Sequence, residues 1–110
     1  MERDRLTFVT SMYKKNPTDS FLAFAAAVEH QMAGNRKRAI EICESIIDED
    51  PEYVDAYYKL GKMFENSNKI DQAKKAYKAG KVIANKTKNQ KSIGELTEAL
   101  MFLDEEEGNW

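Results

Sequence analysis

Two residues of this chain carry side chains suited to covalent or metal chemistry: the single histidine, His30, and the single cysteine, Cys43. A catalytic or metal-binding role would need a second such group at helical spacing, and neither residue has one. A lone cysteine forms no internal disulfide and builds no metal site. The chain also lacks a phosphate-binding glycine loop, an HExxH motif and a nucleophile elbow. We therefore expect no enzyme activity, no metal and no cofactor, and assign both residues to packing.

Length and composition indicate one small domain with an ordinary charged surface. The chain has 110 residues, 33% of them charged, and a formal net charge of −2. This balance disfavours nucleic-acid binding and disorder. The N-terminal segment MERDRLTFV lacks the apolar core of a signal peptide, and no apolar run is long enough to span a membrane. We expect a cytoplasmic protein that does not associate with membranes.

The elements that position these residues are expected to be helices, because apolar residues recur every three or four positions and never alternate. Helices are predicted over 3–15, 19–33 and 36–48. Further helices are predicted from Pro51 to a turn at 66–68, over 69–84 and over 92–104. Polar residues 85–92 are predicted to form the longest linker, and residues 105–110 a frayed acidic tail.

Several residues recur with a period of 34: Pro17 returns as Pro51, and Ala39 returns as Ala73. A fixed period of this length is typical of stacked helical repeats, in which each unit completes its core against its neighbours. Gly61, like Ala27 one period earlier, would let two helices approach closely. The period therefore predicts the architecture more sharply than the function.

The second repeat carries a recognisable motif. It reads Tyr57-x₂-Leu60-Gly61-x₂-Phe64, followed by Ala73-x₃-Tyr77. This pattern resembles the tetratricopeptide repeat, which has Trp-x₂-Leu-Gly-x₂-Tyr, then Ala-x₃-Phe, then Pro. Tyr57 stands where Trp is usual, and Asn85 stands where Pro is usual.

The resemblance implies an all-α fold, a right-handed α–α superhelix of about six antiparallel helices. One domain would cover 1–110, with repeat 1 at 19–50 and repeat 2 at 51–84. The helix at 3–15 would be the second half of an incomplete repeat, and the helix at 92–104 would cap the stack.

The resemblance also implies a scaffold for protein–protein interaction, because the first helix of each repeat in this family lines a concave groove for peptides or helices. The corresponding positions here are Phe21, Phe24, Ala25, Val28, Gln31 and Met32 in repeat 1, and Asp55, Tyr58, Lys59, Lys62, Glu65 and Asn66 in repeat 2. The first set is apolar and the second is polar. Such a groove would suit a partner with hydrophobic anchors at one end and acidic groups at the other.

Other interpretations stay open at this stage. Phe21 and Phe24 could be covered by the N-terminal helix, or by a second copy in a homodimer joined through the apolar groove or the end helices. That second arrangement would make the protein a self-assembling structural module. An outward stripe of Lys74, Lys78 and Lys81 could dock an acidic partner, although the net acidic charge disfavours nucleic acid. The sequence identifies neither the partner nor a role for Trp110.

Overall fold

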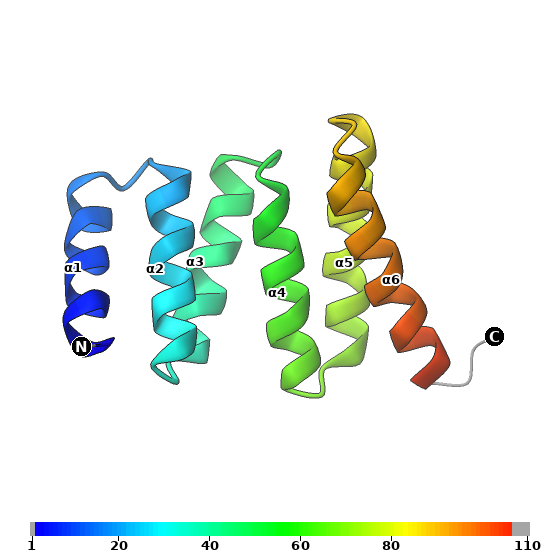
Figure 1. Ribbon diagram of the computed structural model, residues 1–110, viewed down its shortest axis with the longest axis horizontal. Coiled ribbons are helices and arrows are strands. Elements are labelled where there is room, and N and C mark those ends of the chain that lie inside the picture. Colours follow the sequence, from blue (N-terminus) through cyan, green and yellow to red (C-terminus); the bar gives the residue numbers. More distant parts are fainter. Residues whose placement is uncertain (1, 107–110) are drawn as a thin grey trace. The chain divides into compact units, whose positions relative to one another are not determined.

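The computed structural model describes the backbone of residues 2–106 and the side chains of residues 5–104. This part of the chain forms six helices and no strand, which confirms the expected all-α fold. The helices are α1 (Glu2–Lys15), α2 (Ser20–Met32), α3 (Arg36–Glu49), α4 (Val54–Asn66), α5 (Ile70–Lys86) and α6 (Gln90–Glu106) (Figure 1). None of these helices is both long enough and apolar enough to cross a membrane.

The helices belong to two compact units, and the boundary between the units lies within α4, after Ala56. In the first unit, α2 packs against both α1 and α3. In the second unit, α6 packs against α5 (Figure 1). The assignment of one domain with two full repeats stays a prediction.

The core of the first unit is built from small side chains on α2 and larger ones on α3. The buried residues of these two helices are Ala23, Ala26 and Ala27 on α2, and Ala39, Ile42, Cys43 and Ile46 on α3. The helical spacing of the sequence predicts Ile40 and Ile47 to face inward together with Ala39, Cys43 and Ile46, but Ile40 and Ile47 are only half-buried. The buried residues of α3 recur at the three- and four-residue spacing of one helix face, and this phase brings Ile42 inward instead. Cys43 is fully buried, as predicted for a packing residue.

In the second unit, two tyrosines fill the space that two glycines leave open. A Cβ atom added at Gly61 would collide with the ring of Tyr77, and one added at Gly80 would lie 2.7 Å from Cβ of Tyr57. Tyr77 is fully buried, and its hydroxyl donates a hydrogen bond of 2.7 Å to Oε1 of Glu65. Burial, followed by this bond and the charge of Glu65, raises the pKa of Tyr77 far above its usual value. The α4–α5 contact therefore depends on paired small and large residues.

Three of the connecting turns share one backbone pattern. After α2, α4 and α5, a backbone N–H donates to the carbonyl five residues earlier: Asn35 to His30 at 2.8 Å, Lys69 to Phe64 at 2.9 Å, and Asn89 to Ala84 at 2.9 Å. The residue before each donor has a positive φ, 87° at Gly34, 60° at Asn68 and 58° at Lys88. This is the Schellman arrangement, which ends a helix on a left-handed residue.

The two remaining turns, which contain Pro17 and Pro51, have a different pattern. There the N–H of Asp19 donates to Asn16 O at 3.1 Å, and the N–H of Tyr53 donates to Asp50 O at 2.9 Å. The two turn types alternate along the chain until α5, where the Schellman type occurs in place of a proline turn. The junction from α5 to α6 thus departs from the repeat, consistent with Asn85 standing where Pro is usual.

The predicted linker over 85–92 is wrong. Helix α5 continues to Lys86 and α6 begins at Gln90, so only residues 87–89 connect them. The hydroxyl of Thr87 donates to Ile83 O at 3.0 Å, and Oδ1 of Asn89 accepts the N–H of Ser92 at 3.1 Å. These polar side chains cap the two helix ends. Their polar character is therefore explained by the helix termini and does not indicate a long loop.

Candidate functional site

The groove residues predicted in repeat 1 all lie on α2, opposite its buried alanines. Phe21 is 70% exposed and Met32 is 57% exposed, whereas Phe24, Ala25, Val28 and Gln31 are half-buried. The ring of Phe24 lies 5.7 Å from the ring of Tyr53, in a tilted arrangement. The N-terminal helix therefore leaves Phe21 uncovered, so the self-covered interpretation is wrong for that residue.

Tyr53 connects this face of the first unit to several acidic side chains. Burial raises the pKa of Tyr53, and the nearby charges of Asp55, Asp19 and Asp50 raise it further. Asp50 also accepts a hydrogen bond of 2.7 Å from the hydroxyl of Ser20. Asp55, which we predicted as a groove residue, is exposed beside this cluster.

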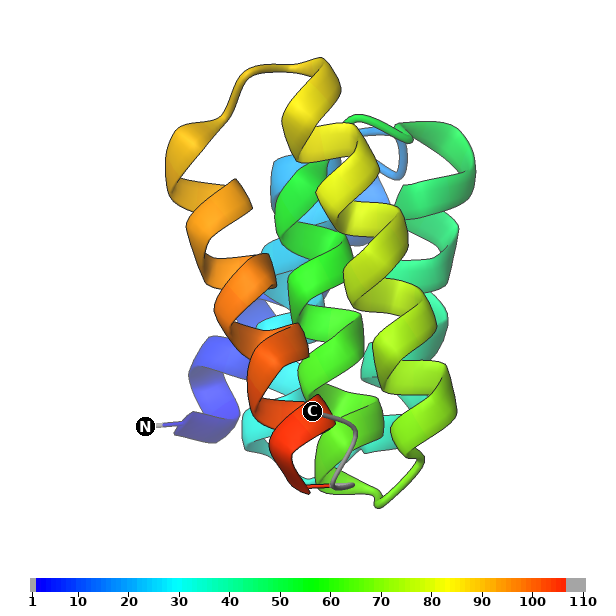
Figure 2. The same ribbon diagram turned by 90° about the vertical axis from the view of Figure 1, so that its right-hand side faces the viewer.

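Three of the groove residues predicted in repeat 2 line one cleft together with residues of α6. The α4 wall consists of Tyr58, Lys62 and Glu65, and the α6 wall consists of Glu95, Glu98, Ala99 and Phe102. The open cleft has a volume of about 410 Å³, within the range of sites that hold small ligands or a few side chains. Figure 2 shows α6 running beside α4 in this unit. Lys59 is half-buried and Asn66 is exposed, and neither is among these lining residues.

The α4 wall of this cleft carries its own charge pairing. Nζ of Lys62 lies 3.9 Å from Oε1 of Glu65 and 5.4 Å from the ring centroid of Tyr58. The same Glu65 oxygen accepts the Tyr77 hydroxyl, and the rings of Tyr58 and Tyr77 are 5.9 Å apart. Lys62 is thus placed over an aromatic ring and beside a carboxylate that the core holds in position.

The α6 wall was not predicted as part of a site. The sequence predicts that the last helix only caps the stack, with Ile93, Leu96, Ala99, Leu100 and Leu103 as its apolar residues. Leu96, Ala99 and Leu103 are buried, whereas Ile93 and Leu100 are only half-buried. Met101 and Phe102 lie outside that buried stripe and are 59% and 52% exposed. The sequence signal that could have indicated this wall is the presence of two large apolar side chains outside the buried stripe of the helix.

His30 is half-buried, and Cys43 is fully buried. Burial lowers the pKa of His30, and the nearby positive charge of Arg38 lowers it further. Nδ1 of His30 lies 3.3 Å from the side-chain amide nitrogen of Asn35, which places an unprotonated ring nitrogen as the acceptor. In the described part of the chain, no three His, Cys, Asp or Glu side chains gather as a metal site would require.

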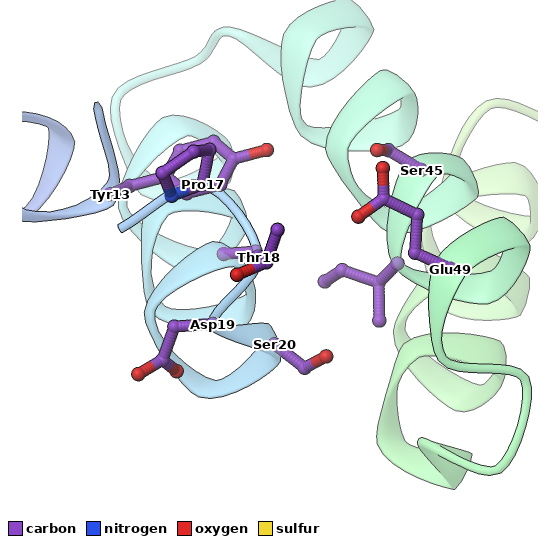
Figure 3. Close-up of a pocket in the computed structure, with 9 residues that line it drawn as sticks. Tyr13, Pro17, Thr18, Asp19, Ser20, Ser45 and Glu49 are labelled. Atoms are coloured by element: carbon purple, nitrogen blue, oxygen red, sulfur yellow. The ribbon is translucent and has the colours of Figure 1, made fainter. Parts of the chain in front are cut away.

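A second hollow lies in the first unit, between the turn at Pro17 and helix α3. Its lining residues include Tyr13, Thr18 and Ser20 on one side and Ser45 and Glu49 on the other (Figure 3). Its volume is only about 10 Å³, which is room for about one water molecule. It is therefore a packing defect rather than a ligand site.

The expected lysine stripe on α5 does not face solvent along its whole length. Nζ of Lys74 lies 3.1 Å from Oδ1 of Asp104 on α6, and its side chain is only 15% exposed. Lys81 is half-buried, and Lys78 is exposed. The prediction of a continuous outward stripe is therefore wrong, because α6 covers the position of Lys74.

Comparison with known proteins decides the family. A sequence profile described as tetratricopeptide repeat matches residues 31–93. The chain belongs to the tetratricopeptide repeat family. A tetratricopeptide repeat domain protein from Salinibacter ruber is 35% identical; its crystal structure gives a TM-score of 0.74, covering 78% of this chain and 96% of that one. The solution NMR structure of a tetratricopeptide repeat domain protein from the same organism gives a TM-score of 0.77 at 35% identity. The match covers 80% of this chain and 89% of that one.

A more distantly similar solved structure matches nearly the whole chain. The crystal structure of MamA gives a TM-score of 0.68 at 15% identity, covering 99% of this chain and 72% of that one, and it shows similarity of fold alone. A search of curated proteins gave no match. Tetratricopeptide repeats are generally non-catalytic scaffolds for protein–protein interaction.

Proposed function

We propose that this tetratricopeptide repeat protein binds a segment of another protein in the cleft between α4 and α6. The observation that carries the proposal is the exposure of Phe102, which is 52% exposed, at a cleft whose opposite wall holds fixed polar groups. Large exposed apolar residues rimmed by polar side chains are typical of interaction surfaces. Because Tyr58, Lys62 and Glu65 are already held by contacts within the unit, the site is preorganised, and less ordering free energy opposes binding.

The proposal predicts that peptides selected against the protein from a random display library bind at this cleft. The variant Phe102→Asp should bind such a peptide about tenfold or more weakly, because an anchor is lost from the site. Val82→Asp is the matched control, since Val82 is 66% exposed on α5 and does not line the cleft. Affinity is measured by fluorescence anisotropy, and the contact site by NMR chemical-shift changes. Equal affinities of the two variants, or a library that yields no binder, would contradict the proposal.

A second candidate function, self-assembly, is favoured by the exposed apolar residues of the first unit. Phe8, Phe21 and Met32 are each more than half exposed. A second copy placed over α2 would remove this apolar surface from water. Sedimentation equilibrium over a wide concentration range tests the idea, with Phe21→Ser expected to shift any dimer towards monomer. A wild-type protein that stays monomeric at the highest concentration contradicts self-assembly.

A further inference from the structure

The charges around the α4–α6 cleft are unevenly distributed. Its lining residues include one cation, Lys62, and three anions, Glu65, Glu95 and Glu98. Lys62 and Glu65 offset each other across 3.9 Å. Glu95 and Glu98 are both exposed, and within the described part of the chain neither forms an ion pair. The cleft therefore has two unneutralised carboxylates on its α6 wall.

These two carboxylates lie on one face of α6, because residues three apart in a helix are neighbours. Phe102 follows Glu98 by four residues on the same face, and Ala99 contributes a buried apolar surface between the walls. An occupant would thus meet an aromatic and aliphatic floor beside two negative charges. This arrangement suits a side chain with an apolar stem and a cationic head, or an apolar residue followed by a basic one.

We propose that the partner segment is basic: it carries Arg or Lys next to a large apolar residue, which packs on Phe102 and Ala99 while the cation reaches Glu95 and Glu98. This inference rests on the proposed function and specifies its ligand class. It reverses the acidic partner expected from the lysines of repeat 2. Lys62 is engaged by Glu65 and the Tyr58 ring, and α6 supplies the carboxylates that decide the sign of the cleft.

A peptide array tests the ligand class directly. Its peptides combine Leu or Phe with Lys or Arg, and matched sets replace every basic residue with Glu or every apolar residue with Ser. The wild-type protein should retain the basic and apolar peptides, lose them on either replacement, and bind them more weakly as salt is raised. Retention of the Glu-containing set, or of peptides without a charge preference, would overturn the inference.

Charge reversal on the protein gives an independent test. The double variant Glu95→Lys and Glu98→Lys should weaken binding of a retained basic peptide by about tenfold or more. The control is Glu44→Lys with Asp48→Lys on α3, which makes the same change in net charge at two exposed residues. If both double variants weakened peptide binding equally, the effect would come from the net charge of the protein, and the inference would be overturned.

The two proposals fail in distinguishable ways. If Phe102→Asp abolishes binding while the Glu95 and Glu98 reversal has no effect, the cleft binds partners but is not selective for basic ones. If peptides of every class fail to bind, both proposals fall. If binding requires Phe102, Glu95 and Glu98 together, both are supported.

Discussion

The α2–α3 and α4–α5 hairpins occupy equivalent positions in the 34-residue repeat, yet they fill their helix contacts with different residues. In α4–α5, Gly61 faces the large Tyr77, and no Cβ fits between them. The equivalent residues of α2–α3 are Ala27 and Cys43, both fully buried. A larger residue on one helix thus accompanies a smaller one on the other. The two repeats therefore share a filled space between their paired helices rather than the same residues at each position.

A second pair of equivalent positions shows the same exchange in the opposite direction. Tyr57 and Gly80 lie in contact in α4–α5, and their equivalents in α2–α3 are Ala23 and Ile46. Here the first helix of α4–α5 carries the large residue, whereas in α2–α3 the second helix does. Ala23 and Ile46 border the water-sized hollow of Figure 3, so the volume match there is imperfect. Pairing across helices therefore explains why the first repeat departs from the family motif.

The largest expected effect comes from giving the second hairpin the residues of the first. Gly61→Ala should destabilise the protein by about 3 kcal/mol, because Tyr77 is fully buried and its hydroxyl is held by Glu65. Tyr77→Cys should cost about 4 kcal/mol through the cavity that it leaves. The loss of unfolding free energy in the double variant should be smaller than the sum of the two single losses by at least about 1 kcal/mol, because neighbouring residues couple. Urea unfolding measures all three free energies.

Gly94→Ala is the matched control for this comparison. Gly94 lies in α6, and an added Cβ would meet nothing within 4 Å beyond its chain neighbours and the backbone of its own helix turn, so the substitution should stabilise the helix by about 0.5–1 kcal/mol. If Gly61→Ala were also neutral or stabilising, or if the two changes in the double variant were additive, the volume-exchange account would be wrong.

A smaller effect is expected at the three Schellman turns, which carry Gly34, Asn68 and Lys88 at the same left-handed position. Lys88→Gly should stabilise the protein by about 0.5–1 kcal/mol, because a lysine pays a steric cost there that glycine avoids. Asn68→Gly should change stability less, since Asn tolerates this conformation better. Thermal unfolding followed by circular dichroism ranks the variants, and a loss of stability in Lys88→Gly would contradict the assigned turn.

The smallest effect concerns His30, which stands where Phe64 stands one repeat later. Its pKa in the folded state is lowered from 6.5, so the unfolded state binds the proton more readily. The stability contribution of neutral His30 is therefore complete above the unfolded pKa and is lost as pH falls from that value. The urea midpoint of the wild type should drop more than that of His30→Phe between pH 7 and about pH 5. If the urea midpoints of the two proteins changed equally with pH, His30 would not contribute to the pH dependence of stability.

The six helices could be predicted from sequence because their apolar spacing and capping residues act over a few positions. The polar segment 16–19 predicts side-chain oxygens at the start of α2, and Oδ1 of Asp19 accepts the N–H of Leu22 at 3.0 Å. The prediction for the junction at 87–89 was wrong because Lys88 in a left-handed conformation gives no local signal comparable to Gly34. Polar composition alone does not distinguish an exposed helix end from a loop.

The candidate site was predicted only on its α4 side. Tyr58, Lys62 and Glu65 followed from the family motif, which fixes their positions relative to Gly61. Glu95, Glu98 and Phe102 lie more than 29 residues further along the chain, and no motif connects them to α4. Their contribution depends on how α6 folds back, which is a matter of long-range packing.

The sequence by itself determined the all-α class, the period and the family, because these follow from residue spacing along single helices. The tertiary structure decided which side chains are available to a partner. It placed Lys74 against Asp104, fixed Lys62 beside Glu65, and set α6 as the second wall of the cleft. The physical reason is that burial and net charge at a surface depend on neighbours from other helices, and local spacing does not encode those neighbours.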